Sequence, residues 1–90
     1  MPSRHVLFPG LHMTPAEIEQ LISTGLPDCK VSVNSEDNTH FDAVVISADF
    51  VGKRQLQRHQ MVYRTLGELM GGEIHALSIQ AMTPDEQAGR

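Results

Sequence analysis

The chain has 90 residues, of which 40% are hydrophobic and 20% charged, so it is long enough for one globular domain but not for a second core. Seven basic and eleven acidic residues give a net charge of −4, which argues against a protein whose whole surface binds nucleic acid. A single cysteine excludes an intrachain disulfide and a zinc site built from cysteine pairs.

Residues 1–12 contain two Pro, one Gly and no periodicity. We therefore expect a flexible N-terminal leader, followed by one domain over residues 13–90. The leader lacks the charged start and long apolar stretch of a signal peptide, and the apolar runs of the chain are too short for a transmembrane helix. These features predict a cytoplasmic protein that does not bind membranes.

The first predicted helix follows a capping box, Thr14-Pro15-Ala16-Glu17, in which Thr14 and Glu17 satisfy each other's backbone N–H groups. Apolar residues at helical spacing continue it, and Gly25 supplies the stop. The alternation over 30–33 predicts a strand, the polar segment 34–39 a turn, and the segment 40–47 a second strand antiparallel to the first.

A long helix is predicted over residues 54–70 and ends at Gly71-Gly72. Its expected apolar face contains Leu56, Val62, Tyr63, Leu66, Leu69 and Met70, and Arg54, Arg58 and Arg64 lie on the opposite side. A third strand follows over 74–82. A second capping box, at 83–86, starts a short last helix.

The element order αββαβα has a topological consequence. A strand, a helix and a strand in sequence usually join parallel strands, whose N-termini then lie at one edge of the sheet. His40 opens the second strand, and His75 is the second residue of the third. Two imidazoles at this edge could bind a borderline metal, with the remaining donors coming from another molecule.

Other residues that could carry chemistry have simpler explanations. His59 is expected to pack in the core, Cys29 to be a strand-edge thiol without a task, and Glu36-Asp37 to be solvated charges in a turn. The segment 53–64 contains four of the seven basic residues, and Lys53, Arg54, Arg58 and Arg64 could contact a phosphate backbone. An ordinary solvated helix face explains this segment about equally well.

Several spaced motifs resemble the BolA family, most closely the branch with a short polar loop between the first two strands. They are THF at 39–41, VVIS at 44–47, FxGK at 50–53, QRHxMVY at 57–63 and IHALSIxAxTPxE at 74–86. The resemblance covers about residues 13–87. It implies an α+β fold in which helices cover a three-stranded mixed sheet, as in the second type of KH domain.

The resemblance also implies a function without catalysis. Members of this family pair with monothiol glutaredoxins and share a bridging 2Fe–2S cluster, in iron–sulfur cluster trafficking or in iron and redox sensing. The glutaredoxin cysteine and glutathione supply sulfur ligands. His75 matches the family's histidine ligand, and His40 is the best match for a second ligand from the loop. We expect the protein without its cluster to be a monomer or a weak homodimer.

Two further functions are weighed against this one. Some BolA proteins are described as transcriptional regulators, so a DNA-binding regulator using the basic segment is the alternative, although the net charge opposes it. A small enzyme is disfavoured because no nucleophile–base pair, phosphate loop or metal motif occurs in the sequence.

Overall fold

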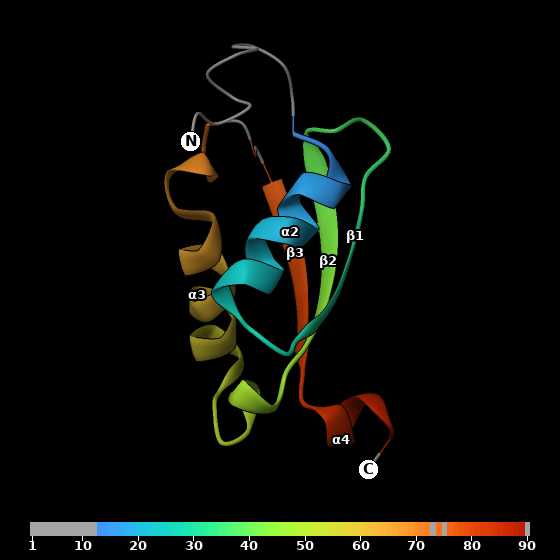
Figure 1. The fold of residues 1–90 in the computed structure, drawn as a ribbon, viewed down its shortest axis with the longest axis vertical. Coiled ribbons are helices and arrows are strands. Elements are labelled where there is room, and N and C mark those ends of the chain that lie inside the picture. The colour runs from blue at the N-terminus through green and yellow to red at the C-terminus, as the bar shows by residue number, and fades with distance from the viewer. Residues whose placement is uncertain (1–12, 73, 75, 90) are drawn as a thin grey trace.

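The computed structural model describes residues 13–72, 74 and 76–89 (Figure 1). The elements in chain order are α2 (Pro15–Gly25), β1 (Lys30–Asn34), β2 (His40–Ile46), η1 (Ala48–Phe50), α3 (Gln55–Leu66), η2 (Gly67–Leu69), β3 (Ala76–Met82) and α4 (Pro84–Gln87). The predicted αββαβα order is therefore confirmed, with two short 3-10 turns in addition. The predicted leader, with His5 and His12, lies outside the described residues. In the described part of the chain, no helix combines the length and apolar character needed to cross a membrane.

Both predicted capping boxes are present. The Thr14 hydroxyl accepts the Glu17 N–H at 3.2 Å, while the Glu17 carboxylate accepts the Thr14 N–H at 2.9 Å. Thr83 and Glu86 make the same pair of bonds at 3.1 and 3.0 Å. These reciprocal bonds satisfy N–H groups that lack helical partners and set where α2 and α4 begin.

The sheet has the strand order β1-β2-β3, with β1 antiparallel and β3 parallel to β2. α3 lies in the connection between the two parallel strands and packs on β3, while α2 packs on β1 and on α3 (Figure 1). Phe41, Ala43 and Val45 of β2 are buried, and the alternate positions His40 and Asp42 are exposed. His40 therefore belongs to the face of β2 opposite its buried residues.

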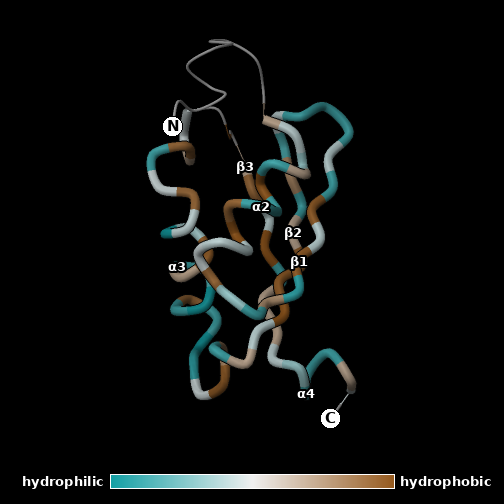
Figure 2. The backbone as a smooth tube through the Cα atoms, viewed as in Figure 1, coloured by the Kyte–Doolittle hydropathy of each residue, from teal (hydrophilic) through white to brown (hydrophobic). Residues whose placement is uncertain are grey.

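One cluster of aliphatic and aromatic side chains forms the core. It joins α2, all three strands, η1 and α3, and in Figure 2 the apolar segments run along the central strands and the inner turns of α2. Its largest fully buried members are Phe41, Phe50, Met13, Ile18, Ile22, Ile74, Val45 and Val62. The turn between β1 and β2 is hydrophilic and lies at the end of the sheet where β2 begins (Figure 2).

The prediction for α3 was wrong in its length and in part of its apolar face. The helix ends at Leu66, because Gly67 takes a φ of 56° and η2 follows, so the stop is not at Gly71-Gly72. Leu56 and Tyr63, expected on the apolar face, are 69% and 38% exposed. The buried positions of α3 are Arg58, Val62 and Leu66. This inward stripe begins with a charged residue, which a hydropathy pattern assigns to the opposite side.

Candidate metal-ligand site at one end of the sheet

The turn between β1 and β2 is organised by two polar side chains. The Ser35 hydroxyl donates to the His40 carbonyl at 2.6 Å and accepts the Asn38 N–H at 2.9 Å. Asp37 Oδ1 accepts the N–H groups of Thr39 at 3.0 Å and of His40 at 2.9 Å. Asn38 has a φ of 58°, a conformation that asparagine tolerates better than most residues. Together these contacts fix the backbone on which the His40 side chain stands.

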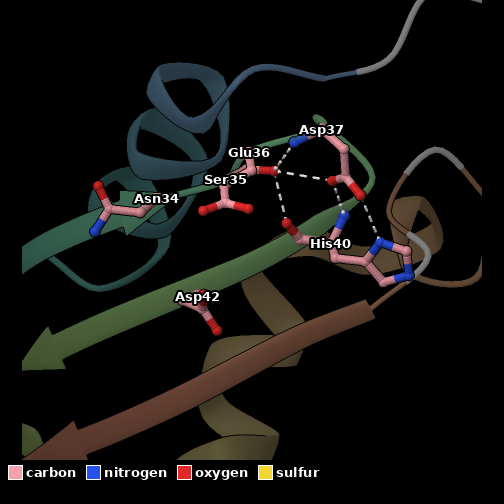
Figure 3. A pocket seen from close by; sticks show the side chains of 6 residues that line it. All are labelled: Asn34, Ser35, Glu36, Asp37, His40 and Asp42. Atoms are coloured by element: carbon pink, nitrogen blue, oxygen red, sulfur yellow. Dashed lines mark hydrogen bonds and ion pairs between the residues drawn. The ribbon is translucent and has the colours of Figure 1, made fainter.

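The same carboxylate also holds the His40 ring. Asp37 Oδ2 lies 2.9 Å from His40 Nδ1, and the second ring nitrogen points away from the turn (Figure 3). The bonds from the His40 backbone, the His40 ring and the Thr39 backbone lower the pKa of Asp37 well below its usual range. An ionised Asp37 carboxylate can only accept a hydrogen bond in this contact. In a neutral ring with this hydrogen bond, Nε2 carries the lone pair that can bind a metal.

The surroundings of His40 are open and polar. Its side chain is 70% exposed at a hollow of about 570 Å³, which is lined by Asn34, Ser35, Glu36, Asp37, His40 and Asp42 (Figure 3). Among the residues that the structure describes, no group of three or more His, Cys, Asp or Glu side chains is arranged to hold a metal ion. His40 thus fits the role of one exposed imidazole ligand, with other ligands to be added from elsewhere.

The strand register confirms that β2 and β3 begin at the same end of the sheet. His40 is the Cα partner of Ala76, and the Ala76 N–H donates to the Thr39 carbonyl at 3.4 Å. His75, the stronger ligand candidate in the sequence, precedes Ala76 but lies outside the described residues. The approach of the two imidazoles therefore stays a prediction, while the pairing of the strands on which it depends is established.

Cys29 lies at the other end of the sheet. It directly precedes β1, whose first residue, Lys30, pairs with Ile46 at the far end of β2 from His40. At about 3.3 Å per residue, the seven residues of β2 separate these two ends by about 20 Å. Burial raises the pKa of the Cys29 thiol, which disfavours the reactive thiolate. Cys29 is therefore not part of the His40 site.

The basic segment 53–64 differs from the sequence prediction in one respect. Arg58 was expected on the exposed face, but it is only 6% exposed. Its guanidinium donates to the Lys53 and Ala81 carbonyls at 2.8 and 3.1 Å and to the Glu86 carboxylate at 2.7 and 3.2 Å. Because these bonds hold Arg58 inside the molecule, it has no free face for phosphate. Its role is to tie α3 to the end of β3 and to α4.

The other three basic residues of the segment are exposed. Lys53 and Arg54 precede the first turn of α3, and Arg64 lies in its last turn. Arg54 and Arg64 are ten positions apart in the sequence, which is about 15 Å along a helix axis. With Arg58 turned inward, these cations form two separate groups rather than one continuous stripe.

Asp37 is the functional candidate that the sequence did not reveal. As one of two adjacent acids in a polar turn, it was interpreted as a solvated charge. An aspartate three residues before a histidine was the available signal, but that spacing brings the two side chains together only in a suitable turn. The turn's conformation, including the positive φ of Asn38, supplies the missing information.

Residues 23–86 match the BolA family, described as "BolA-like protein". The chain belongs to this family, as the motifs predicted.

Individual relatives agree with this assignment. The chain is 43% identical over 53 residues to "DNA-binding transcriptional regulator BolA" of Haemophilus influenzae, covering 59% of this chain and 52% of that protein. It is 52% identical over 46 residues to "BolA-like protein 1" of Homo sapiens, covering 51% and 34%. Its fold is similar to that of a bolA protein homologue from Coxiella burnetii, with a TM-score of 0.76, 43% identity and coverage of 84% and 97%. The chain spans about half the length, or less, of these two curated relatives.

Proposed function

We propose that this chain is a non-enzymatic partner protein that supplies imidazole ligands to a 2Fe–2S cluster shared with a monothiol glutaredoxin. The observation that carries the proposal is His40, an exposed ring at the shared end of β2 and β3 whose Nδ1 is bonded to Asp37. His75 is the second proposed ligand. Its assignment rests on the family motif at 74–86 and on its position next to Ala76 in the sequence.

Ligand chemistry explains why a thiol partner is required. Iron–sulfur clusters are held mainly by cysteine thiolates, and the cysteine of this chain lies at the end of the sheet far from His40. The glutaredoxin cysteine and glutathione would supply the sulfur ligands. Imidazole ligation raises the reduction potential of such a cluster relative to full thiolate ligation. Only neutral imidazole coordinates iron, so assembly should weaken as the pH falls.

The test is anaerobic reconstitution with a monothiol glutaredoxin, glutathione, ferrous iron and sulfide, followed by visible absorption and circular dichroism. We expect a mixed-ligand spectrum with the wild-type chain that is lost in His75→Ala and altered in His40→Ala. His59→Ala is the matched control, because His59 lies on α3 beside the far end of β3 and should leave the spectrum unchanged. An unchanged spectrum in both His75→Ala and His40→Ala would contradict the proposal.

DNA binding is the second candidate function. The Haemophilus influenzae relative is named a DNA-binding regulator, and Lys53, Arg54 and Arg64 are exposed. Phosphate contacts predict an affinity that falls steeply with salt, and replacing one contacting cation should reduce that slope by about 1. We would measure the slope for Arg54→Gln and Arg64→Gln by fluorescence anisotropy. No binding to duplex DNA even at low salt would exclude this function.

A further inference from the structure

We propose that Asp37 is a positioning residue that holds His40 in the Nδ1–H tautomer and thereby makes Nε2 the metal-binding atom. This inference rests on the proposed function for its purpose. The effect of the Asp37 carboxylate on the His40 tautomer can be tested in the protein without any metal.

The Asp37 carboxylate cannot turn freely. Asp37 Oδ1 accepts two backbone N–H groups, from Thr39 and His40, so this oxygen is committed to the turn. Oδ2 is then directed at His40 Nδ1, 2.9 Å away. One carboxylate thus binds both the backbone and the ring of the same residue, and this pair of bonds restricts the rotation of the His40 side chain (Figure 3).

The contact with Asp37 also decides which ring nitrogen of His40 keeps a lone pair. A carboxylate can only accept a hydrogen bond, so Nδ1 must carry the proton that is shared with Asp37. In the neutral ring Nε2 is then unprotonated. Glu36 and Asp42 also line the hollow, and the structure pairs the ring with Asp37 rather than with either of them. A metal-ligating histidine commonly donates its other N–H to a carboxylate, and the Asp37–His40 pair has this arrangement.

Asp37→Asn separates this role from a purely structural one. The amide oxygen can still accept the Thr39 and His40 N–H groups, so the turn can persist. The amide NH₂ then faces His40 Nδ1 and can only donate to it, which requires an unprotonated Nδ1 and moves the ring proton to Nε2. We therefore expect the substitution to invert the tautomer of His40 while the fold is retained.

The tautomer is measured from the ring-nitrogen chemical shifts of the metal-free protein, using long-range proton–nitrogen correlation at about pH 8, where an ordinary imidazole is neutral. Wild type should show mainly the Nδ1–H form and Asp37→Asn mainly the Nε2–H form. Asp42→Asn is the matched control, since Asp42 lines the same hollow and should leave the tautomer unchanged. The same tautomer in wild type and Asp37→Asn would overturn the inference.

The reconstitution assay then tests whether the Asp37–His40 contact supports cluster binding. Removing a carboxylate that orients a metal-ligating histidine typically weakens metal binding by about 10- to 100-fold, and we expect a loss of this size in Asp37→Asn. If Asp37→Asn inverts the His40 tautomer but assembles the cluster as well as wild type does, the positioning role is overturned. If the tautomer inverts as expected but His40→Ala and His75→Ala leave the wild-type spectrum unchanged, the tautomer inference stands and the proposed function fails.

Discussion

Arg58 should contribute more to stability than any exposed cation of the basic segment, and Arg58→Met tests this. Methionine keeps much of the aliphatic stem but removes the guanidinium, which makes four hydrogen bonds of 2.7–3.2 Å. The guanidinium carbon Cζ also lies over the Phe50 ring, 5.9 Å from its centroid.

The expected loss of stability depends on how the hydrogen-bond acceptors of Arg58 are satisfied after the substitution. Ala81 O still accepts a bond from Gln55 Nε2 at 3.3 Å, and the Glu86 side chain is 45% exposed, so water can replace part of what is lost. Counting two of the four charge-assisted bonds at about 1.5 kcal/mol each gives a loss of about 3 kcal/mol. Domains of this size have a total stability of about 4–12 kcal/mol, so the loss should be large.

Urea unfolding followed by far-UV circular dichroism measures the effect. With a slope of about 1 kcal/mol per molar urea, the midpoint should fall by about 3 M in Arg58→Met. Arg54→Met is the matched control, because Arg54 is exposed and its change should stay within about 0.5 kcal/mol. If Arg58→Met is as stable as Arg54→Met, the reasoning is refuted, because the guanidinium of Arg58 then contributes no more to stability than that of an exposed arginine.

Two further predictions concern the same part of the fold and the packing of the helices. The Arg58 guanidinium lowers the pKa of Glu86, so the stability from this pair is complete above the unfolded-state pKa of about 4.3 and is lost as the pH falls through the lower native pKa. The difference in unfolding midpoint between wild type and Arg58→Met should therefore narrow in acid, and a constant difference would contradict this account. Separately, a Cβ at Gly25 would lie 2.5 Å from Thr65 Cγ2, so Gly25→Ala should push α2 away from α3 and lower the free energy of unfolding by about 1–3 kcal/mol. Gly72→Ala, whose Cβ would meet only ordinary contacts at 3.7 Å, is the control, and both variants are measured by calorimetry. Equal losses of stability in the two variants would show that the close approach to Thr65 is not responsible.

The features predicted correctly were those encoded by short-range patterns. A capping box needs four consecutive residues, and both boxes form as expected at Thr14 and Thr83. The β-branched and aromatic composition of residues 40–47 identified the second strand, which the structure places at His40–Ile46. The rule that a helical connection joins parallel strands then placed the start of β3 beside His40. These inferences needed no knowledge of distant side chains.

The wrong predictions concern features that depend on contacts between residues far apart in the sequence. Hydropathy places Arg58 outside, but a guanidinium can be buried when its N–H groups find acceptors. Here carbonyls of β3 and of the loop before α3, and a carboxylate of α4, accept its hydrogen bonds. Gly67 and Gly71 both take a positive φ, and the sequence does not show which of the two glycines ends α3. In both cases the local sequence allows more than one conformation, and contacts in the folded protein determine which one forms.

The candidate site combines both kinds of information. The location of His40 follows from the topology, because the first residue of β2 must lie near the start of any parallel neighbour. The state of its ring does not follow from topology. It depends on Asp37, which reaches the ring only because Ser35 and Asn38 close the turn in one conformation. A substitution that loosens this turn should therefore leave His40 at the same end of the sheet but release its ring, so position and ligand orientation are separable properties of this site.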